Sequence, residues 1–291
     1  MLKHLLLSGL LFLAGTVFSQ KNTHAKSPKT SDTLDLAEAL AQKLVSAEVI
    51  SGGGYTGLSL RITLRSLQKQ VYRIRVPLGQ YLMPSDTMAQ RLVVAENHVA
   101  LVGIRAVELK VRTFCTQAGH TSPMNNMRFA VGAQAPEQMR QLLQYLVQTN
   151  KTSNSWAQNA VWCLSDRHPV ANIEDPALGE FVAKLLGVEP PKYRIRRQPV
   201  RQAPGLPANV GKALIVEGSF SYYLHRQELL SLRLYDAAGK VVQVIFQDRK
   251  TADGEHEATL HLKMHDLPAG KYFVRLQAKD GALVKEMEVE I

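Results

Sequence analysis

Cysteine is scarce in this sequence, and the signatures of several common site types are missing. The 291 residues include 2 cysteines, Cys115 and Cys163. After residue 20 no apolar run approaches the roughly 20 residues of a membrane-spanning helix, so no integral membrane segment is predicted. The glycines at 52–54 precede a strand pattern, not a helix, which excludes a phosphate-binding loop of the usual kind. The histidines near the C-terminus lack ligand spacing, so neither a metal nor a cofactor is predicted.

Composition and charge narrow the class of protein. Hydrophobic residues make up 45% of the chain and charged residues 21%, which is typical of a folded globular protein, and the length fits two modest domains. The formal net charge is +10, and part of it is concentrated in one stretch without acids, which contains Lys192, Arg194, Arg196, Arg197 and Arg201. Few aromatic residues accompany these charges, so we interpret the stretch as a solvated linker and expect no nucleic acid partner.

The N-terminus has the layout of a signal peptide over residues 1–20. Lys3 and His4 precede an apolar run over 5–13, and small residues follow it before polar Lys21. No cysteine ends this leader, so lipid attachment is not expected. The polar residues 21–33 are predicted to form a flexible tether, and the protein is expected to be secreted or held at the cell surface.

Residues 34–189 are predicted to form an α+β head, in which antiparallel strands carry appended helices. Leu36, Leu40 and Leu44 recur at helical spacing and predict a first helix that ends before Ser51. Alternating apolar residues then predict strands, and later apolar stripes predict helices. The strands cover 58–64, 72–76, 91–102 and 104–113, and the helices cover 136–148, 155–164 and 176–186.

A proline-rich, basic linker over 190–212 is predicted to separate this head from a second domain. Its prolines favour a stiff, extended chain. Over 213–291 every periodic segment alternates like a strand, and turns rich in Asp, Gly and Pro separate the segments. We therefore predict an all-β, immunoglobulin-like sandwich with strands over 213–220, 229–235, 241–246, 257–263, 271–278 and 283–291.

The state of the two cysteines has three alternatives. An exported protein meets an oxidising environment, which favours a disulfide between Cys115 and Cys163. In the chain-entropy account such a bond stabilises the fold by about 4 kcal/mol. Two free thiols are the second alternative. The third depends on the local sequence around each cysteine.

Two short motifs in the head resemble the signatures of bacterial surface thioester domains. They are FCTQ at 114–117, where a cysteine follows an aromatic residue, and AQNAVW at 157–162, which is similar to a helical Gln-x-Ala-apolar-Trp motif. The resemblance implies an internal thioester between Cys115 and Gln158. It also implies that this thioester acylates amines on surface or matrix proteins and so attaches the cell covalently.

Physical reasoning supports the same pairing. A thiol that displaces ammonia from a carboxamide must be held against it in a dry site, which a strand end facing a buried helix provides. Phe114 and Trp162 are predicted to wall this site, Trp162 lying one turn beyond Gln158. Cys163 is offset by about 140° from Gln158 around the helix, so the disulfide and the thioester are competing geometries.

Two other functions remain open. One is a non-covalent binding or structural envelope protein that contains the disulfide. The other is a Cys-dependent acyl-transfer enzyme in which Cys115 is the nucleophile, His120 or His168 the base, and Asp166 the residue that orients the base. Turn formation also explains Asp166, and loop histidines are commonly solvated, so we predict that the protein is not an enzyme.

The second domain resembles the C-terminal sorting domains of type IX secretion cargo. The likeness is carried by LRLYDAAGK at 232–240, a strand followed by an Asp/Gly hairpin, and by LPAGKYFV at 267–274, which contains a Leu-x-x-Gly-x-Tyr step. The resemblance implies contact with the secretion machinery. The sequence thus predicts an exported attachment protein whose C-terminal domain routes it to the surface.

Overall fold

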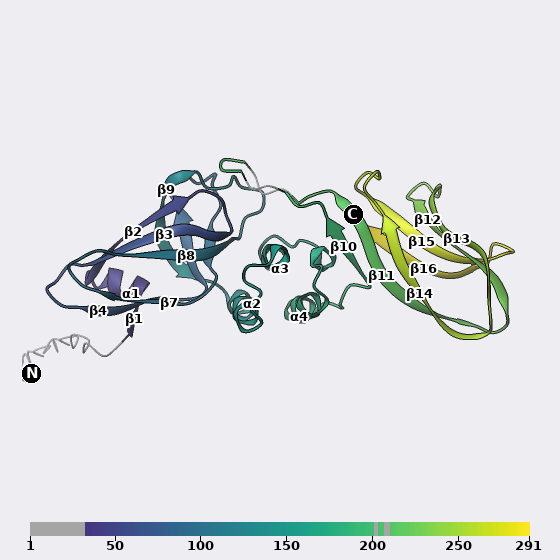
Figure 1. Cartoon of the computed structure of the whole chain (residues 1–291), viewed down its shortest axis with the longest axis horizontal. Helices are drawn as coiled ribbons and strands as arrows, with labels where there is room; N and C mark the ends of the chain where they lie inside the picture. The colour runs from purple at the N-terminus through teal and green to yellow at the C-terminus, as the bar shows by residue number, and fades with distance from the viewer. Residues whose placement is uncertain (1–32, 201–202, 207–209) are drawn as a thin grey trace, which may run out of the picture.

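The computed structural model describes residues 33–200, 203–206 and 210–291. The predicted signal peptide and all but the last residue of the predicted tether lie outside these ranges. A strand-rich head stands at one end of the described chain and a second strand-rich unit at the other, with the helices over residues 137–186 between them (Figure 1). Within these ranges, no helix is long and apolar enough to cross a membrane.

The head is built on a closed antiparallel barrel. Strand β9 pairs with both β5 and β2, which closes the ring in the order β2-β3-β8-β6-β5-β9. The barrel core is formed by inward-facing side chains such as Leu60, Ile62 and Val111. The barrel strands are β2 (Val45–Gly52), β3 (Gly57–Ser66), β5 (Gln80–Pro84), β6 (Leu92–Val94), β8 (Val107–Cys115) and β9 (Asn125–Gln134).

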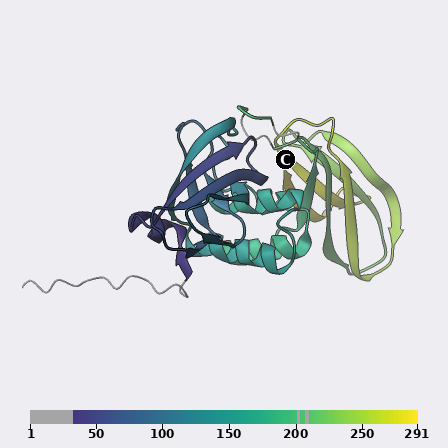
Figure 2. The ribbon, with the colours of Figure 1, turned by 60° about the vertical axis from the view of Figure 1, so that its left-hand side comes forward.

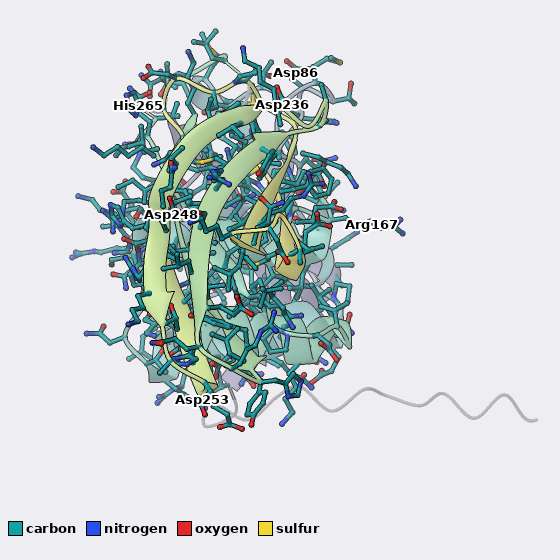
Figure 3. The ribbon with its side chains drawn as sticks, turned by 90° about the vertical axis from the view of Figure 1, so that its right-hand side faces the viewer. Asp86, Arg167, Asp236, Asp248, Asp253 and His265 are labelled. Carbon is teal, nitrogen blue, oxygen red and sulfur yellow. The ribbon has the colours of Figure 1, made fainter. Side chains whose placement is uncertain are left out.

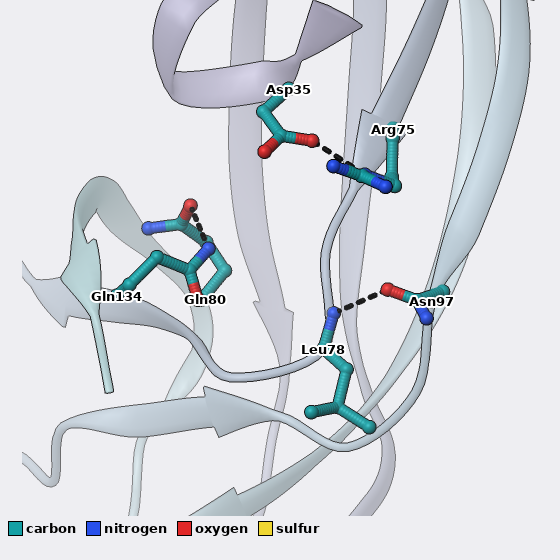
Figure 4. Close-up of polar contacts among 6 residues, drawn as sticks. All are labelled: Asp35, Arg75, Leu78, Gln80, Asn97 and Gln134. Atoms are coloured by element: carbon teal, nitrogen blue, oxygen red, sulfur yellow. Dashed lines mark hydrogen bonds and ion pairs between the residues drawn. The ribbon is translucent and has the colours of Figure 1, made fainter. Parts of the chain in front are cut away.

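A small sheet and a short helix extend this core. The sheet has the order β1-β4-β7, and the helix α1 contributes Leu36 and Ala39 to the barrel core. Polar contacts fix the edges of this region, including an Arg75–Asp35 ion pair with an Nε–Oδ1 distance of 2.5 Å (Figure 4). The elements are β1 (Thr33–Asp35), α1 (Leu36–Ala41), β4 (Tyr72–Val76) and β7 (His98–Val102).

Tight turns connect these sheets to the barrel. Asn97 accepts a hydrogen bond at Oδ1 from the backbone N–H of Leu78, and Gln134 donates from Nε2 to Oε1 of Gln80 (Figure 4). The turn around Asn97 also divides the strand that the sequence predicts over 91–102 into β6 and β7. The predicted strands over 58–64 and 72–76 are confirmed as β3 and β4.

The first helix is shorter than the sequence predicts. It ends at Ala41, and residues 45–52 form β2, which pairs with β3 and β9. Val45 and Val49 are buried four residues apart, a spacing that a helix and a strand share. The prediction of helix up to Ser51 is therefore wrong, because pairing within the barrel decides the conformation.

The three later helices agree with the sequence predictions and form a second core. They are α2 (Glu137–Gln148), α3 (Ser155–Ser165) and α4 (Pro176–Leu186), with a short 3-10 turn η1 (Val170–Asn172) before α4. Asp175 caps α4 by accepting a hydrogen bond from Leu178 N–H, and Gly187 ends it with a left-handed φ of 68°. The helices pack on the outer face of β6 and β8 through Val93 and Phe114.

The C-terminal unit consists of two sheets that share one apolar core. One sheet has the order β10-β11-β14 and the other β13-β12-β15-β16, as the predicted β-sandwich requires. Asp236 and Asp253 lie in turns at opposite ends of this unit (Figure 3). The strands are β10 (Tyr193–Arg197), β11 (Ala213–Leu224), β12 (Glu228–Asp236), β13 (Val241–Thr251), β14 (Gly254–Lys263), β15 (Lys271–Ala278) and β16 (Leu283–Glu290).

The stretch predicted to be a linker takes part in the fold. Its residues 193–197 form β10, an edge strand that pairs with β11. Arg197 donates from Nε to Oδ1 of Asn172 at 2.9 Å, and Ala171 of η1 packs in the core of the C-terminal unit. The helices of the head therefore lie directly beside the C-terminal sheets (Figure 2).

Candidate functional site

The end of strand β8 separates the two cores of the head. Because side chains alternate along a strand, Thr113 and Cys115 face the barrel interior and Phe114 faces the helices. Thr113 and Cys115 are fully buried. The Thr113 hydroxyl is hydrogen-bonded to Ser59 on the neighbouring strand β3, with an Oγ1–Oγ distance of 2.5 Å. This strand end therefore holds the thiol in a rigid, dry position.

Helix α3 brings Gln158 onto the backbone of Cys115. The Gln158 Oε1 atom accepts a hydrogen bond from Cys115 N–H at 2.9 Å, and its Nε2 atom donates to Cys115 O at 2.8 Å. Gln158 is only 6% exposed. The amide thus continues the hydrogen bonding of β8 as another strand would, and its orientation is fixed at both ends. Of the predicted site residues, this pair is in direct contact.

The sulfur of Cys115 lies in a mixed environment. Gln117 N–H donates a hydrogen bond to it at 3.2 Å. Burial raises the pKa of the Cys115 thiol to about 12, although the Gln117 N–H and the Trp162 indole both favour the thiolate. The thiol is therefore protonated at neutral pH, and any reaction at the sulfur must also move its proton.

Aromatic rings lie beside Cys115 and Gln158. The Trp162 ring lies between the rings of Tyr55 and His168, with centroid distances of 5.9 Å and 5.5 Å. Trp162 belongs to the barrel core together with Cys115, whereas Phe114 belongs to the helical core. Burial, assisted by the nearby thiol, raises the pKa of Tyr55 to about 12. Tyr55 therefore stays a neutral wall of the site at physiological pH.

Cys163 lies in the helical core, away from the site. It packs with Val161 and Ala160, and its sulfur lies 3.7 Å from Pro169 O. Burial raises its pKa to about 12. Both cysteines are free in the structure, which thus does not contain the Cys115–Cys163 disulfide that the sequence offers as an alternative.

The residues proposed for an acyl-transfer enzyme contact other groups. His120 Nδ1 lies 3.4 Å from Ala89 O, and His168 packs on Trp162. Asp166 accepts from Ala118 N–H at 2.9 Å, which fixes the loop after Cys115. These contacts give Asp166 a role in shaping the loop, and they do not align a histidine with the thiol.

A cavity of about 280 Å³ opens beside Gln158. Gln158 and Trp162 form part of its wall, so the cavity reaches the Gln158 side of the buried pair. The rest of the wall comes from β8, α3, the end of β10 and the loops around them. Its residues include Arg112 of β8, Glu174 before α4, Arg197 of β10 and Gly211.

Sequence reasoning missed several of these residues. Tyr55, Glu174 and Arg197 lie far from both motifs in the chain and carry no pattern of their own that marks a site. Only the barrel closure and the packing of η1 against β10 bring them to the cavity. Among the described residues, no group of His, Cys, Asp and Glu is arranged to hold a metal ion.

The arrangement combines a nucleophile, an acyl group and a donor. The thiol of Cys115 is the nucleophile, the carboxamide of Gln158 is the acyl group, and Cys115 N–H already donates to the amide oxygen. A donor on that oxygen stabilises the negative charge that develops when a nucleophile attacks the carbonyl. The site can therefore support acyl transfer from Gln158 to sulfur.

Comparison with known proteins identifies the C-terminal unit. Residues 216–290 match the family model described as secretion system C-terminal sorting domain. The match confirms the resemblance predicted for this part of the chain and indicates secretion to the cell surface. No curated protein and no solved structure matches the chain. The thioester-domain resemblance of the head stays a prediction.

Proposed function

We propose that the protein is an exported surface protein whose head attaches covalently to amines of other proteins through a thioester between Cys115 and Gln158. One observation carries the proposal, namely the pair of hydrogen bonds that holds the Gln158 amide against Cys115 in a buried site. The sorting-domain match over 216–290 supports export and contact with the secretion machinery. In this proposal, the function of the head is covalent attachment to surface or matrix proteins.

Formation of the bond needs no cofactor or oxidant. The Cys115 sulfur attacks Cδ of Gln158, a carbon–sulfur bond forms, and the carbon–nitrogen bond of the amide breaks. Ammonia leaves with the proton that the thiol gives up. The raised pKa of the thiol means that this proton moves during the attack, and Cys115 N–H stabilises the oxyanion.

Attachment is the second acyl transfer. A primary amine attacks the thioester carbonyl, an amide bond forms between the amine and Gln158, and the Cys115 thiol is released. The cavity beside Gln158 gives the amine a route to the carbonyl. Burial of both residues keeps water from competing as the nucleophile.

The intact mass of the mature chain tests the proposal. We expect a deficit of one ammonia, and addition of methylamine should convert it to a methylamide at Gln158. Cys115→Ala should abolish both effects. Cys163→Ala is the matched control and should leave both unchanged, because Cys163 lies in the other core.

Two results would contradict the thioester. An unmodified mass that does not respond to methylamine leaves a non-covalent binding head. A deficit of two hydrogens that a reductant restores shows the Cys115–Cys163 disulfide and a structural role for the head.

A further inference from the structure

The inference rests on the proposed function and concerns the partner protein. We propose that the cavity beside Gln158 binds a carboxylate group of the partner, with Arg197 as its main ligand and Arg112 as the second. The head then attaches to amines that have an acidic residue nearby, such as a lysine flanked by glutamates.

Arg197 is a half-buried cation without a carboxylate partner in the described structure. Its Nε donates to Asn172 Oδ1 at 2.9 Å and its Nη1 to Gly211 O at 3.1 Å, and both acceptors are neutral. Burial lowers the pKa of the guanidinium, although it stays charged at neutral pH. A guanidinium held by neutral acceptors keeps further N–H groups for an incoming anion. The two bonds also hold its position, which reduces the entropy lost on binding.

The remaining charges of the cavity favour an anion. Among the described residues, the charged members of its wall are Arg112, Arg197 and Glu174, which together carry one more positive than negative charge. Glu174 accepts a hydrogen bond from the Arg197 backbone and lies in the field of Arg196. Arg112 is 22% exposed, and its Nε is 3.9 Å from the nearest Glu96 oxygen, a loose ion pair.

The location of this charge links it to the acyl group. Arg112 lies three residues before Cys115 on β8, and Gln158 lines the same cavity. A carboxylate held by the arginines therefore brings the neighbouring amine of the same peptide close to Gln158. Positioning of this kind raises the rate of acyl transfer because the amine no longer has to find the carbonyl by collision.

Peptide binding to the full chain carrying Cys115→Ala tests the proposal without any thioester. The probes are acetylated and amidated peptides that differ only in the residues beside one lysine, either glutamate or glutamine. We expect the glutamate peptide to bind about tenfold more tightly, the effect of one charge-assisted hydrogen bond. A glutamine peptide with a free C-terminal carboxylate distinguishes an acidic side chain from a chain end as the source of the carboxylate.

Neighbouring arginines supply the controls. Arg197→Gln should abolish the preference for the glutamate peptide and Arg112→Gln should reduce it. Arg196→Gln should leave it unchanged, because Arg196 is exposed and pairs with Glu217. Arg197→Lys keeps the charge and tests whether a loss arises from a changed fold, since it should retain part of the preference.

Equal affinity for the two acetylated peptides would overturn the proposal, as would a preference that survives in Arg197→Gln. Failure of the thioester is a separate result. It shows as an unmodified mass in the chain that retains Cys115, whatever the peptides bind.

Discussion

The head and the C-terminal unit bury different kinds of side chain. Among the described residues, all but one of the buried polar side chains belong to the head, and the exception is Ser231 in β12. The C-terminal core consists of apolar side chains such as Leu232 and Val274. Burial of a polar group is costly unless it is hydrogen-bonded, so a fold that does it repeatedly needs a specific arrangement.

This difference fits the proposed division of roles between the head and the C-terminal unit. In the head, the buried polar groups Thr113 and Gln158 gather around the end of β8, beside the thiol. In the C-terminal unit, the buried side chains are almost all apolar, and Asp and Gly gather in the turns from β12 onward. A sorting domain must present a recognisable surface, whereas an acylating site must fix individual atoms. The predictions below test this contrast.

The tryptophans allow the two parts to be observed separately. The chain has 2 tryptophans, Trp156 and Trp162, and both lie in α3. Tryptophan fluorescence therefore reports unfolding of the head alone, and circular dichroism reports both parts. Each comparison below uses the Cys115→Ala chain, so that no thioester contributes.

The largest expected difference in stability between the head and the C-terminal unit appears at high pH and depends on Cys163. Its pKa is about 12 in the folded chain, against about 8.5 in the unfolded chain. As the pH rises, the Cys163 thiol loses its proton first in the unfolded state. The contribution of this thiol to the stability of the head is therefore complete below the unfolded pKa and is lost as the pH rises toward about 12. The head should lose about 4 kcal/mol over this range, measured by urea unfolding followed by tryptophan fluorescence.

The control for this loss is Cys163→Ala. It should lower the stability of the head at neutral pH, because it removes buried volume, and should flatten the dependence on pH. The C-terminal unit contains no cysteine and should show a weaker dependence. An unchanged slope in Cys163→Ala would show that another group causes the alkaline loss.

The second difference concerns the buried hydrogen bonds. Gln158→Leu leaves both backbone groups of residue 115 without a partner, which should destabilise the head by about 2 kcal/mol. In the C-terminal unit, Ser231 Oγ accepts one bond from Asp248 N–H at 3.1 Å, so Ser231→Ala should cost about 1 kcal/mol. Urea midpoints from fluorescence and circular dichroism measure the two effects. A larger cost for Ser231→Ala would remove the contrast.

The same contrast explains which elements the sequence predicts. The sequence predicts the strands β11 to β16 as a set, because apolar residues alternate in several of them, such as β14 and β15, and Asp, Gly or Pro occur in the turns from β12 onward. Strand β9 was missed because it buries only Phe129. Strand β10 was missed because Ile195 is the only buried residue between its arginines. Pairing with a neighbouring strand, which the sequence does not display, determines both.

The candidate site is predictable to a similar extent. The motifs at 114–117 and 157–162 identify Cys115, Gln158 and Trp162, because these residues lie on one strand end and one helix face. The residues of the cavity come from elements that meet only in the folded chain. From the sequence, Arg197 is interpreted as part of a solvated linker, because only its charge is visible there. Its contact with Asn172 depends on how η1 packs, which the sequence does not display.

The smallest expected difference in stability between the head and the C-terminal unit appears at low pH and depends on Asp175. This residue caps α4 and pairs with Lys151, with an Oδ2–Nζ distance of 2.5 Å. Burial opposes ionisation, but the bonds from Lys151 and Leu178 prevail and lower the pKa of Asp175. Its stabilisation is therefore complete above the unfolded pKa of about 3.9 and is lost as the pH falls through the folded value.

Asp175→Asn should consequently lower the free energy of unfolding of the head by about 1 kcal/mol at neutral pH. This cost should disappear at acid pH, where the carboxyl of the parent chain is also neutral. The matched change in the C-terminal unit is Asp236→Asn, in a turn where Asp236 accepts bonds from Ala238 and Lys240 N–H. Both donors in that turn are backbone N–H groups, which carry no charge, so its cost should depend less on pH. Urea unfolding at about pH 7 and about pH 2 separates the two, followed by tryptophan fluorescence for Asp175→Asn and by circular dichroism for Asp236→Asn. The ionised cap that is paired with Lys151 should make the cost in the head the more sensitive to acid.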